Sequence, residues 1–410
     1  MRKLPFFVFL ATVVYLILLF RYSERAPKRH YNDFRVYYST AQQFIHRENI
    51  YSPADGSITP FKYSPMFAFL TAPLGFLSEK SAALVFFTLN FLALGAVMYF
   101  SMKLILPNGW PWKKRTWLVV LTLVLNFRFI LGVLDSGQVN LLMLALAVSG
   151  LYFLRGRKIV TGAAMLALSV MVKYVTFIFV PYLLVKKRFK EALLVLLFIA
   201  VYCVLPATVL GVEKQTEYLK GWLPQITQTS LDRGSWTDYK NQSIYSWVIR
   251  SVMKDSPYPP GWPLLSFEHA RMLGVLLTLG LYIFMLLPAG NSVFLENIDL
   301  ALLFCGLALF NPNSWPFNYV SLLFAGTLIF YHLLDNEFRD KVTCAWLAVV
   351  VILINCASES LVGERWQHFL ETRSMLTLGG LAILVILFRL KFLRASETRP
   401  GALPPGRPGL

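Results

Sequence analysis

Charged side chains are scarce in this chain of 410 residues. Lysine, arginine, aspartate and glutamate together make up 15% of it, well below the roughly one quarter that is usual for soluble domains. Only 22 residues are acidic, against 39 basic ones, and hydrophobic residues make up 56%. So few polar side chains cannot cover the surface of a soluble protein of this size, and we therefore expect a membrane protein.

Several motifs of soluble enzymes are also missing. The sequence contains no GxxxxGK[ST] phosphate loop, no HExxH, no GxSxG and no Asp-x-Asp pair. The four cysteines match neither zinc-site nor disulfide spacing. These absences disfavour nucleotide-sugar and metal-hydrolase chemistry, and we expect neither a metal nor another cofactor.

Long apolar runs are what the sequence does contain. Residues 4–20, 82–106, 117–134 and 375–388 approach the ~20 residues that cross a hydrocarbon core as a helix. The first run lacks a small-residue cleavage pattern, so it is predicted to be a retained helix rather than a signal peptide. We predict an all-α polytopic membrane protein with about twelve transmembrane elements and both ends in the cytoplasm.

Lysine and arginine lie in short clusters between these runs rather than on one polar domain, which disfavours nucleic acid as a partner. The positive-inside rule assigns the clusters to the cytoplasm. They occupy residues 113–115, 155–158, 186–190, 339–341 and 389–394.

This orientation places the unusual polar residues on the outer face. Residues 159–185 are too few for two full spans, so they are predicted to form two short helices that turn near Lys173. A long outer loop is predicted from 212 to about 265. It forms the active-site face together with residues 21–79 of a single membrane domain, 1–393, while 394–410 are predicted to be a disordered cytoplasmic tail.

Asp33 opens a segment, residues 31–45, whose apolar side chains recur at helical spacing. This pattern predicts an amphipathic helix along the outer interface. Asn32 or Asp33 could serve as its N-cap, which is a common use of these residues. Alternatively, Asp33 could act as a general base at the membrane surface.

Other polar residues at the predicted outer boundary are candidate substrate contacts. Lys62 and Tyr63 could equally be a snorkelling cation and a belt tyrosine. Gln138 and Asn140 could form hydrogen bonds with sugar hydroxyls or cap a helix. Lys173 is an ionisable group inside apolar sequence, so it is a functional candidate whose expected partner is a phosphate. The remaining candidates follow the later helices, and they are Asn241, Gln242, Arg250, Trp315 and Asn318.

Taken in order, these pieces resemble glycosyltransferase family 87, the bacterial polyprenol-phosphate-mannose-dependent mannosyltransferases of the C-type membrane superfamily. The resemblance spans most of the chain. It rests on Asp33 with Tyr38, Lys62-Tyr63-Ser64-Pro65, Gly137-Gln138-Val139-Asn140, Lys173 with Pro181, Asn241-Gln242-Ser243 with Arg250, and Ser314-Trp315. The chain departs from the family where Tyr174 follows Lys173 and where Pro316-Phe317-Asn318 follows Trp315.

The resemblance implies the C-type glycosyltransferase fold, with the aspartate of the first outer loop as the catalytic base. Asp33 is the residue that matches this position. It also implies a polyprenyl-phosphate sugar donor, a lipid-linked or cell-envelope glycan acceptor, and metal-independent inverting transfer. Lys62, Lys173 and Arg250 would bind the donor phosphate, while Tyr63 and the amides would orient substrate.

The expected function is therefore transfer of a single sugar, mannose by resemblance, at the outer face of the bacterial inner membrane. Two alternatives remain at this point. A lipid or sugar transporter or flippase would also use broken helices and a lysine at membrane depth. An oligosaccharide ligase or polymerase would use a lipid-pyrophosphate donor instead.

Overall fold

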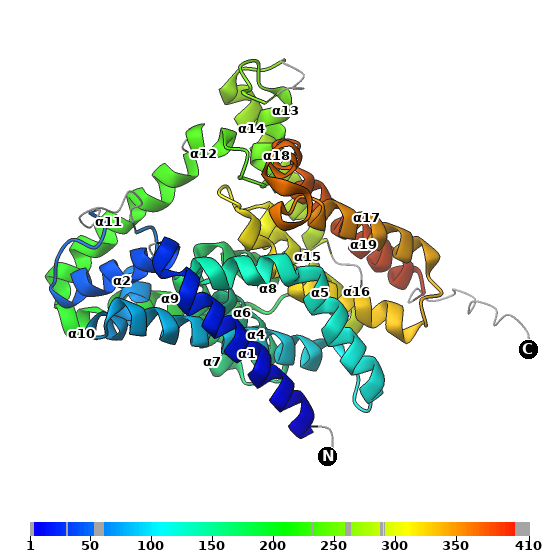
Figure 1. Ribbon diagram of the computed structural model, residues 1–410, viewed down its shortest axis with the longest axis horizontal. Helices are drawn as coiled ribbons and strands as arrows, with labels where there is room; N and C mark the ends of the chain where they lie inside the picture. Colours follow the sequence, from blue (N-terminus) through cyan, green and yellow to red (C-terminus); the bar gives the residue numbers. More distant parts are fainter. Residues whose placement is uncertain are drawn as a thin grey trace, which may run out of the picture. The chain divides into compact units, whose positions relative to one another are not determined.

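The computed structural model describes residues 4–29, 32–52, 61–231, 233–258, 264–287, 290 and 292–397. Within these residues the chain consists of helices and connecting segments and contains no β-strand, apart from one isolated bridge between Met253 and Leu265 (Figure 1). The α-helices of the first half are α1 (Leu4–Arg25), α2 (Asn32–Ile45), α3 (Pro65–Thr71), α4 (Glu79–Ile105), α5 (Trp112–Ser136), α6 (Asn140–Arg155), α7 (Ile159–Val172), α8 (Phe179–Val185), α9 (Phe189–Val204), α10 (Ala207–Leu210) and α11 (Val212–Leu231). The later ones are α12 (Arg233–Thr237), α13 (Ile244–Val252), α14 (Phe267–Leu286), α15 (Val293–Leu309), α16 (Leu322–Asp335), α17 (Lys341–Asn355), α18 (Glu359–Thr372) and α19 (Met375–Glu397).

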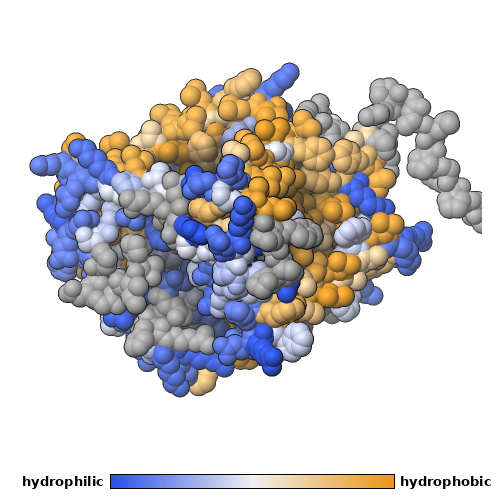
Figure 2. Space-filling model, turned by 90° about the horizontal axis from the view of Figure 1, so that it is seen from above, coloured by the Kyte–Doolittle hydropathy of each residue, from blue (hydrophilic) through white to orange (hydrophobic). Residues whose placement is uncertain are grey.

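Six helices among the described residues are long and apolar enough to cross a membrane. They are Glu79–Ile105, Trp112–Ser136, Phe189–Leu210, Phe267–Leu286, Pro316–Asp335 and Met375–Ala395. Large apolar side chains such as Leu193 and Val124 are exposed on these helices, and Figure 2 shows broad areas of hydrophobic surface. Such areas need hydrocarbon around them. The chain is an all-α polytopic membrane protein, as predicted, while the count of about twelve elements stays a prediction.

The chain divides into two compact units. Unit 1 is drawn from Met1–Phe100, Phe129–Leu184 and Arg188–Asp232, and unit 2 from Ser101–Arg128, Val185–Lys187 and Arg233–Leu410. Each unit is described by itself below, and the single domain expected from the sequence stays a prediction.

Helices α6 and α7 form the closest helix pair of unit 1 (Figure 1). Gly150 and Gly162 lie at their contact. A Cβ atom on Gly162 would stand 2.7 Å from the Leu154 backbone nitrogen and 2.8 Å from the Gly150 carbonyl oxygen. Only glycine permits such an approach, which is typical of helices packed inside membranes. Because a short turn joins the two helices, the start of α6 and the end of α7 lie at the same end of the pair.

The predicted break near Lys173 is confirmed. Helix α7 ends at Val172, Lys173 has extended backbone angles (φ −153°, ψ 110°), and a 3₁₀ turn, η3 (Tyr174–Ile178), leads into α8. Neither α7 nor α8 is long enough to span a bilayer alone. The break therefore places a lysine between two short apolar helices.

Unit 2 is held together by α15, α17 and α19, and Figure 1 shows α17 and α19 side by side. A buried ion pair ties further segments to this core. Arg128 of α5 donates to Glu371 of α18 at 3.1 Å and to the Ile354 carbonyl at 3.0 Å. Breaking such a pair would leave an uncompensated buried charge, so these segments are fixed relative to one another.

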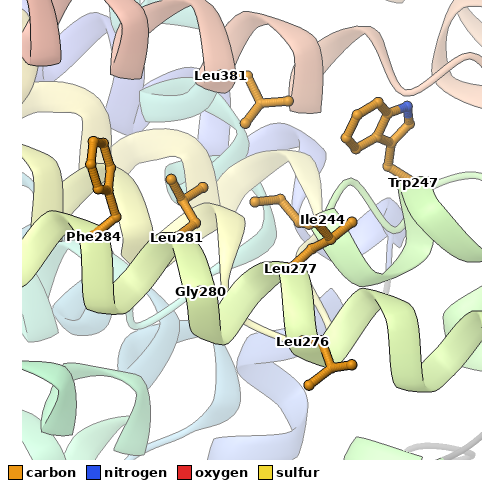
Figure 3. Close-up of a pocket in the computed structure, with 8 residues that line it drawn as sticks. All are labelled: Ile244, Trp247, Leu276, Leu277, Gly280, Leu281, Phe284 and Leu381. Carbon is orange, nitrogen blue, oxygen red and sulfur yellow. The ribbon is translucent and has the colours of Figure 1, made fainter.

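An apolar groove lies between α13, α14 and α19 of unit 2, with a volume of about 440 Å³ (Figure 3). Phe284 and Leu281 of α14 point toward Leu381 of α19, while Ile244 and Trp247 of α13 close one end. Gly280 has nothing within 4 Å of where its Cβ would stand, which leaves the groove open there. Without an ionisable side chain the groove suits hydrocarbon and offers no group for phosphate or proton chemistry.

The structure differs from two expectations about the later segments. The predicted outer loop from 212 to 265 is largely helical, with α11, α12 and α13 in it. Trp222, Trp236 and Trp247 lie on these helices, whereas residues 238–243 form the turn between α12 and α13. Helix α17, with 15 residues, is short for a full crossing.

The second difference concerns the chain around the last span. Helix α18, between α17 and α19, was not predicted, and its backbone kinks at Gly363 (φ 78°). Helix α19 continues to Glu397, so the first four residues of the predicted tail are helical. The rest of that tail, 398–410, lies outside the described residues.

Candidate active site

Asp33 lies in the first turn of α2, the amphipathic helix predicted from the sequence. The buried face of α2 includes Phe34, Tyr37 and Ala41. The Asp33 side chain is partly exposed, and its Oδ2 accepts a hydrogen bond from Gln138 Nε2 at 2.5 Å. Within the described part of the chain, no backbone N–H of α2 bonds this carboxylate, so Asp33 does not act as the N-cap.

Gly137 brings Gln138 against α2. It ends the α5 segment with φ +65°, a conformation that favours glycine. A Cβ atom there would stand 2.6 Å from Phe34 Cβ. The turn between α5 and α6 can therefore approach α2 closely only because position 137 lacks a side chain, and this approach places the Gln138 amide at the carboxylate.

Lys173 and Asn140 meet at the shared end of α6 and α7. Lys173 Nζ donates to Asn140 Oδ1 at 2.8 Å, and Asn140 is buried. The two residues were predicted separately as a cation and an amide on the outer face. The structure of unit 1 brings these two residues together beside the turn that carries Gln138. Gln138 precedes Asn140 by two residues in the sequence.

The charges of this cluster act on one another. Burial raises the pKa of the Asp33 carboxyl above its ordinary value of 3.8, while the hydrogen bond from Gln138 and the nearby Lys173 cation lower it, and the net shift is upward. A carboxylate with a raised pKa is a better proton acceptor than an exposed aspartate. Raised pKa values of this origin are typical of functional sites.

Residues 61–64 border the same cluster in unit 1. The Tyr63 hydroxyl lies 2.8 Å from that of Tyr37, and Tyr51 donates to the Tyr63 carbonyl at 3.1 Å. Ser64 caps α3 and also donates to the Met171 carbonyl, which ties this segment to α7. Lys62 is partly exposed in the same segment.

The candidates of unit 2 are engaged mainly with backbone. Both polar atoms of the Asn241 amide form hydrogen bonds with backbone. Its Nδ2 donates to the carbonyls of Ser235 and Pro312. Its Oδ1 accepts from the backbone nitrogens of Ser243 and Ser314. Gln242 Nε2 donates to the carbonyls of Tyr239 and Glu371. These amides fasten the segment around Ser314 to the start of α13.

Arg250 is also buried in this part of unit 2. Its guanidinium donates to the carbonyl oxygens of Asp238 (2.5 Å) and Asn241 (2.8 Å) and to Ser374 Oγ (2.6 Å). Burial lowers its pKa to about 10, so it remains a cation at neutral pH. A role in binding a donor phosphate stays a prediction.

Trp315 and Asn318 border the turn that leads into the 3₁₀ helix η4 (Pro316–Ser321). Trp315 is partly exposed and stacks on Phe317, with ring planes 7° apart. Asn318 is buried and donates to the Asn313 carbonyl at 3.1 Å. Their contact with substrate stays a prediction as well.

Tyr37 contacts the cluster of unit 1 although it was not among the residues predicted from the sequence. The family resemblance instead includes its neighbour Tyr38, whose hydroxyl bonds the Leu77 carbonyl. Tyr37 instead faces Gln138 and Tyr63. Its position four residues after Asp33 was the available signal, because side chains at that spacing lie on one face of a helix.

The described residues contain no group of three His, Cys, Asp or Glu side chains that could hold a metal ion. Residues 61–310, more than half of the chain, match the sequence model of glycosyltransferase family 87. A comparison with curated proteins finds no match. The matched range includes Lys62, Gln138 and Lys173, whereas Asp33 precedes it and joins it through the hydrogen bond to Gln138.

Proposed function

Because this chain belongs to glycosyltransferase family 87, we propose that it transfers a single sugar, mannose, from a polyprenyl-phosphate carrier. The acceptor is a lipid-linked or cell-envelope glycan, and transfer takes place on the extracytoplasmic face of the bacterial inner membrane. The observation that carries the proposal is the cluster of Asp33, Gln138, Asn140 and Lys173, which puts a carboxylate of raised pKa near a cation in a membrane protein.

The proposed reaction is a single displacement. Asp33 takes the proton of an acceptor hydroxyl while that oxygen attacks the anomeric carbon. The bond from the anomeric carbon to the phosphate oxygen breaks, and its electron pair leaves with the polyprenyl phosphate. Attack from the opposite face inverts the anomeric configuration. Because a phosphate monoester is already a good leaving group, the enzyme needs cations rather than a general acid.

Lys173 is the cation that we assign to the departing phosphate, with Lys62 and Arg250 as further candidates. Gln138 and Asn140 orient the base and the lysine, and Tyr63 lies beside them. For Asn241 and Gln242 the hydrogen bonds favour a positioning role, because their amides hold the Ser314 segment. That segment carries Trp315, which we propose as an aromatic surface for sugar.

The raised pKa of Asp33 predicts the acid limb of the pH profile. The carboxyl must be ionised to accept a proton, so activity persists above the raised pKa and falls as the pH drops through it. We expect the acid limb of kcat/KM to lie above pH 3.8. In Gln138→Leu the limb should move further up, because the hydrogen bond that lowers this pKa is lost. A limb at or below the ordinary aspartate value, or a downward move in Gln138→Leu, would contradict the assignment.

The proposed function is tested by reconstituting the full chain in liposomes with radiolabelled polyprenyl-phosphate mannose and an envelope lipid extract as acceptor. We expect release of polyprenyl phosphate and an acceptor lengthened by one residue. Parallel donors carrying glucose or a pentofuranose test the choice of sugar. Movement of intact donor between leaflets without consumption would indicate a transporter, and use of pyrophosphate-linked oligosaccharide alone would indicate a ligase or polymerase.

A further inference from the structure

Three side chains form a chain of hydrogen bonds that ends at Asp33. Gln138 Nε2 donates to Asp33 Oδ2 at 2.5 Å, Tyr37 donates to Gln138 Oε1 at 3.5 Å, and the hydroxyls of Tyr37 and Tyr63 lie 2.8 Å apart. Tyr37 is almost fully buried and Gln138 is 5% exposed. This series of hydrogen bonds is therefore largely shielded from water.

The direction of each bond follows from the chemistry of the groups. An ionised carboxylate only accepts, so the NH₂ group of Gln138 must face Asp33, and its Oε1 must face Tyr37. The Tyr37 hydroxyl then donates to Oε1, and Tyr63 donates to the Tyr37 oxygen. Burial raises the pKa of both phenols, so both remain protonated and able to donate.

The Tyr37 hydroxyl also lies near the backbone of the same turn. Its hydroxyl oxygen interacts with the backbone N–H of Val139, the residue after Gln138. Its ring is fixed by edge contacts with Phe67 and Tyr63, each with centroids 5.2 Å apart. Because the ring is held in place, its hydroxyl stays at the amide oxygen and can fix which way the Gln138 amide points.

We propose that Tyr37 is a positioning residue that acts through Gln138 to orient the Asp33 carboxylate. This inference rests on the proposed role of Asp33 as the base. Without the Tyr37 hydroxyl the amide can turn over and present Oε1 to the carboxylate, where two acceptors repel. Asp33 would then lose a hydrogen bond that stabilises its charged form.

The test is Tyr37→Phe, which keeps the ring and its packing and removes only the hydroxyl. We expect kcat to fall about tenfold, in line with the loss of one buried hydrogen bond, and the acid limb of the pH profile to move to higher pH. Tyr38→Phe is the matched control, since its hydroxyl bonds the Leu77 carbonyl. It should leave both quantities unchanged.

A double-mutant cycle separates positioning from simple loss of stability. If Tyr37 acts through Gln138, Tyr37→Phe should add nothing to kcat or to the acid limb once Gln138→Leu is present. Fully additive effects, or a Tyr37→Phe variant with unchanged kcat and pH profile, would overturn the inference. Absence of transfer by the unmodified protein would instead contradict the proposed function.

Discussion

Asp33→Asn should abolish sugar transfer while leaving a folded, membrane-inserted protein. Asparagine has the same shape as aspartate and its oxygen can still accept from Gln138, but it cannot take a proton from an acceptor hydroxyl. Loss of a general base costs about a hundredfold or more in rate. The measurement is single-sugar transfer in liposomes, with thermal unfolding and membrane extraction followed on the same preparation.

Asp135→Asn provides the matched control. Asp135 lies in the last turn of α5, also in unit 1, and its carboxylate pairs with Arg21 at 2.5 Å with about a quarter of the side chain exposed. Asparagine keeps the shape of aspartate and its oxygen can still accept from Arg21, so this variant should retain most of its turnover. If Asp33→Asn kept near-normal turnover, Asp33 could not be the base.

Lys173→Met should produce the second largest loss. Methionine keeps the length and apolar stem of lysine but removes the charge that we assign to the departing phosphate. Removing one group that stabilises developing negative charge costs roughly a hundredfold. We expect the loss in kcat/KM for the lipid-phosphate donor, measured by varying donor concentration at saturating acceptor.

Two further variants test whether the loss of activity in Lys173→Met comes from the loss of the lysine's charge. Lys80→Met removes an exposed lysine in the first turn of α4, also in unit 1, and should have no effect. Lys173→Arg keeps the charge, so it should recover part of the activity that Lys173→Met loses. An arginine variant no better than methionine would contradict the assignment of the lysine to the departing phosphate through its charge.

The helices were largely predictable because hydrocarbon demands continuous apolar helices. The break at Lys173 was predictable from chain length between two basic clusters. Helix α11 was not, because its polar residues gave no transmembrane signal and a mixed polar and aromatic composition is also typical of loops. Helix α18 was missed for the same reason, and its kink at Gly363 further disrupts any periodic pattern.

The site was predictable where a polar residue interrupts apolar sequence. Lys173 stood out for this reason, whereas Asp33, Gln138 and Asn140 were candidates from their place at the predicted outer boundary and from the family resemblance. The structure of unit 1 brings these four candidates together. Tyr37 did not, because a tyrosine at a membrane interface is unremarkable in sequence, and its partner Gln138 lies 101 residues away. Nor can composition reveal whether an amide such as that of Asn241 bonds a sugar or a neighbouring carbonyl.

The glycine contact between α6 and α7 has a consequence for how this enzyme could change. The backbones of α6 and α7 touch at Gly150 and Gly162, so the two helices cannot slide past each other. This contact, although well away from Asn140 and Lys173, therefore sets the distance between those two residues. Residues around the proposed sugar site can then vary without changing the distance between Asn140 and Lys173, the lysine that we assign to the phosphate. Adding a single methyl group at Gly150 or Gly162 would disturb the placement of Asn140 and Lys173 without touching either residue.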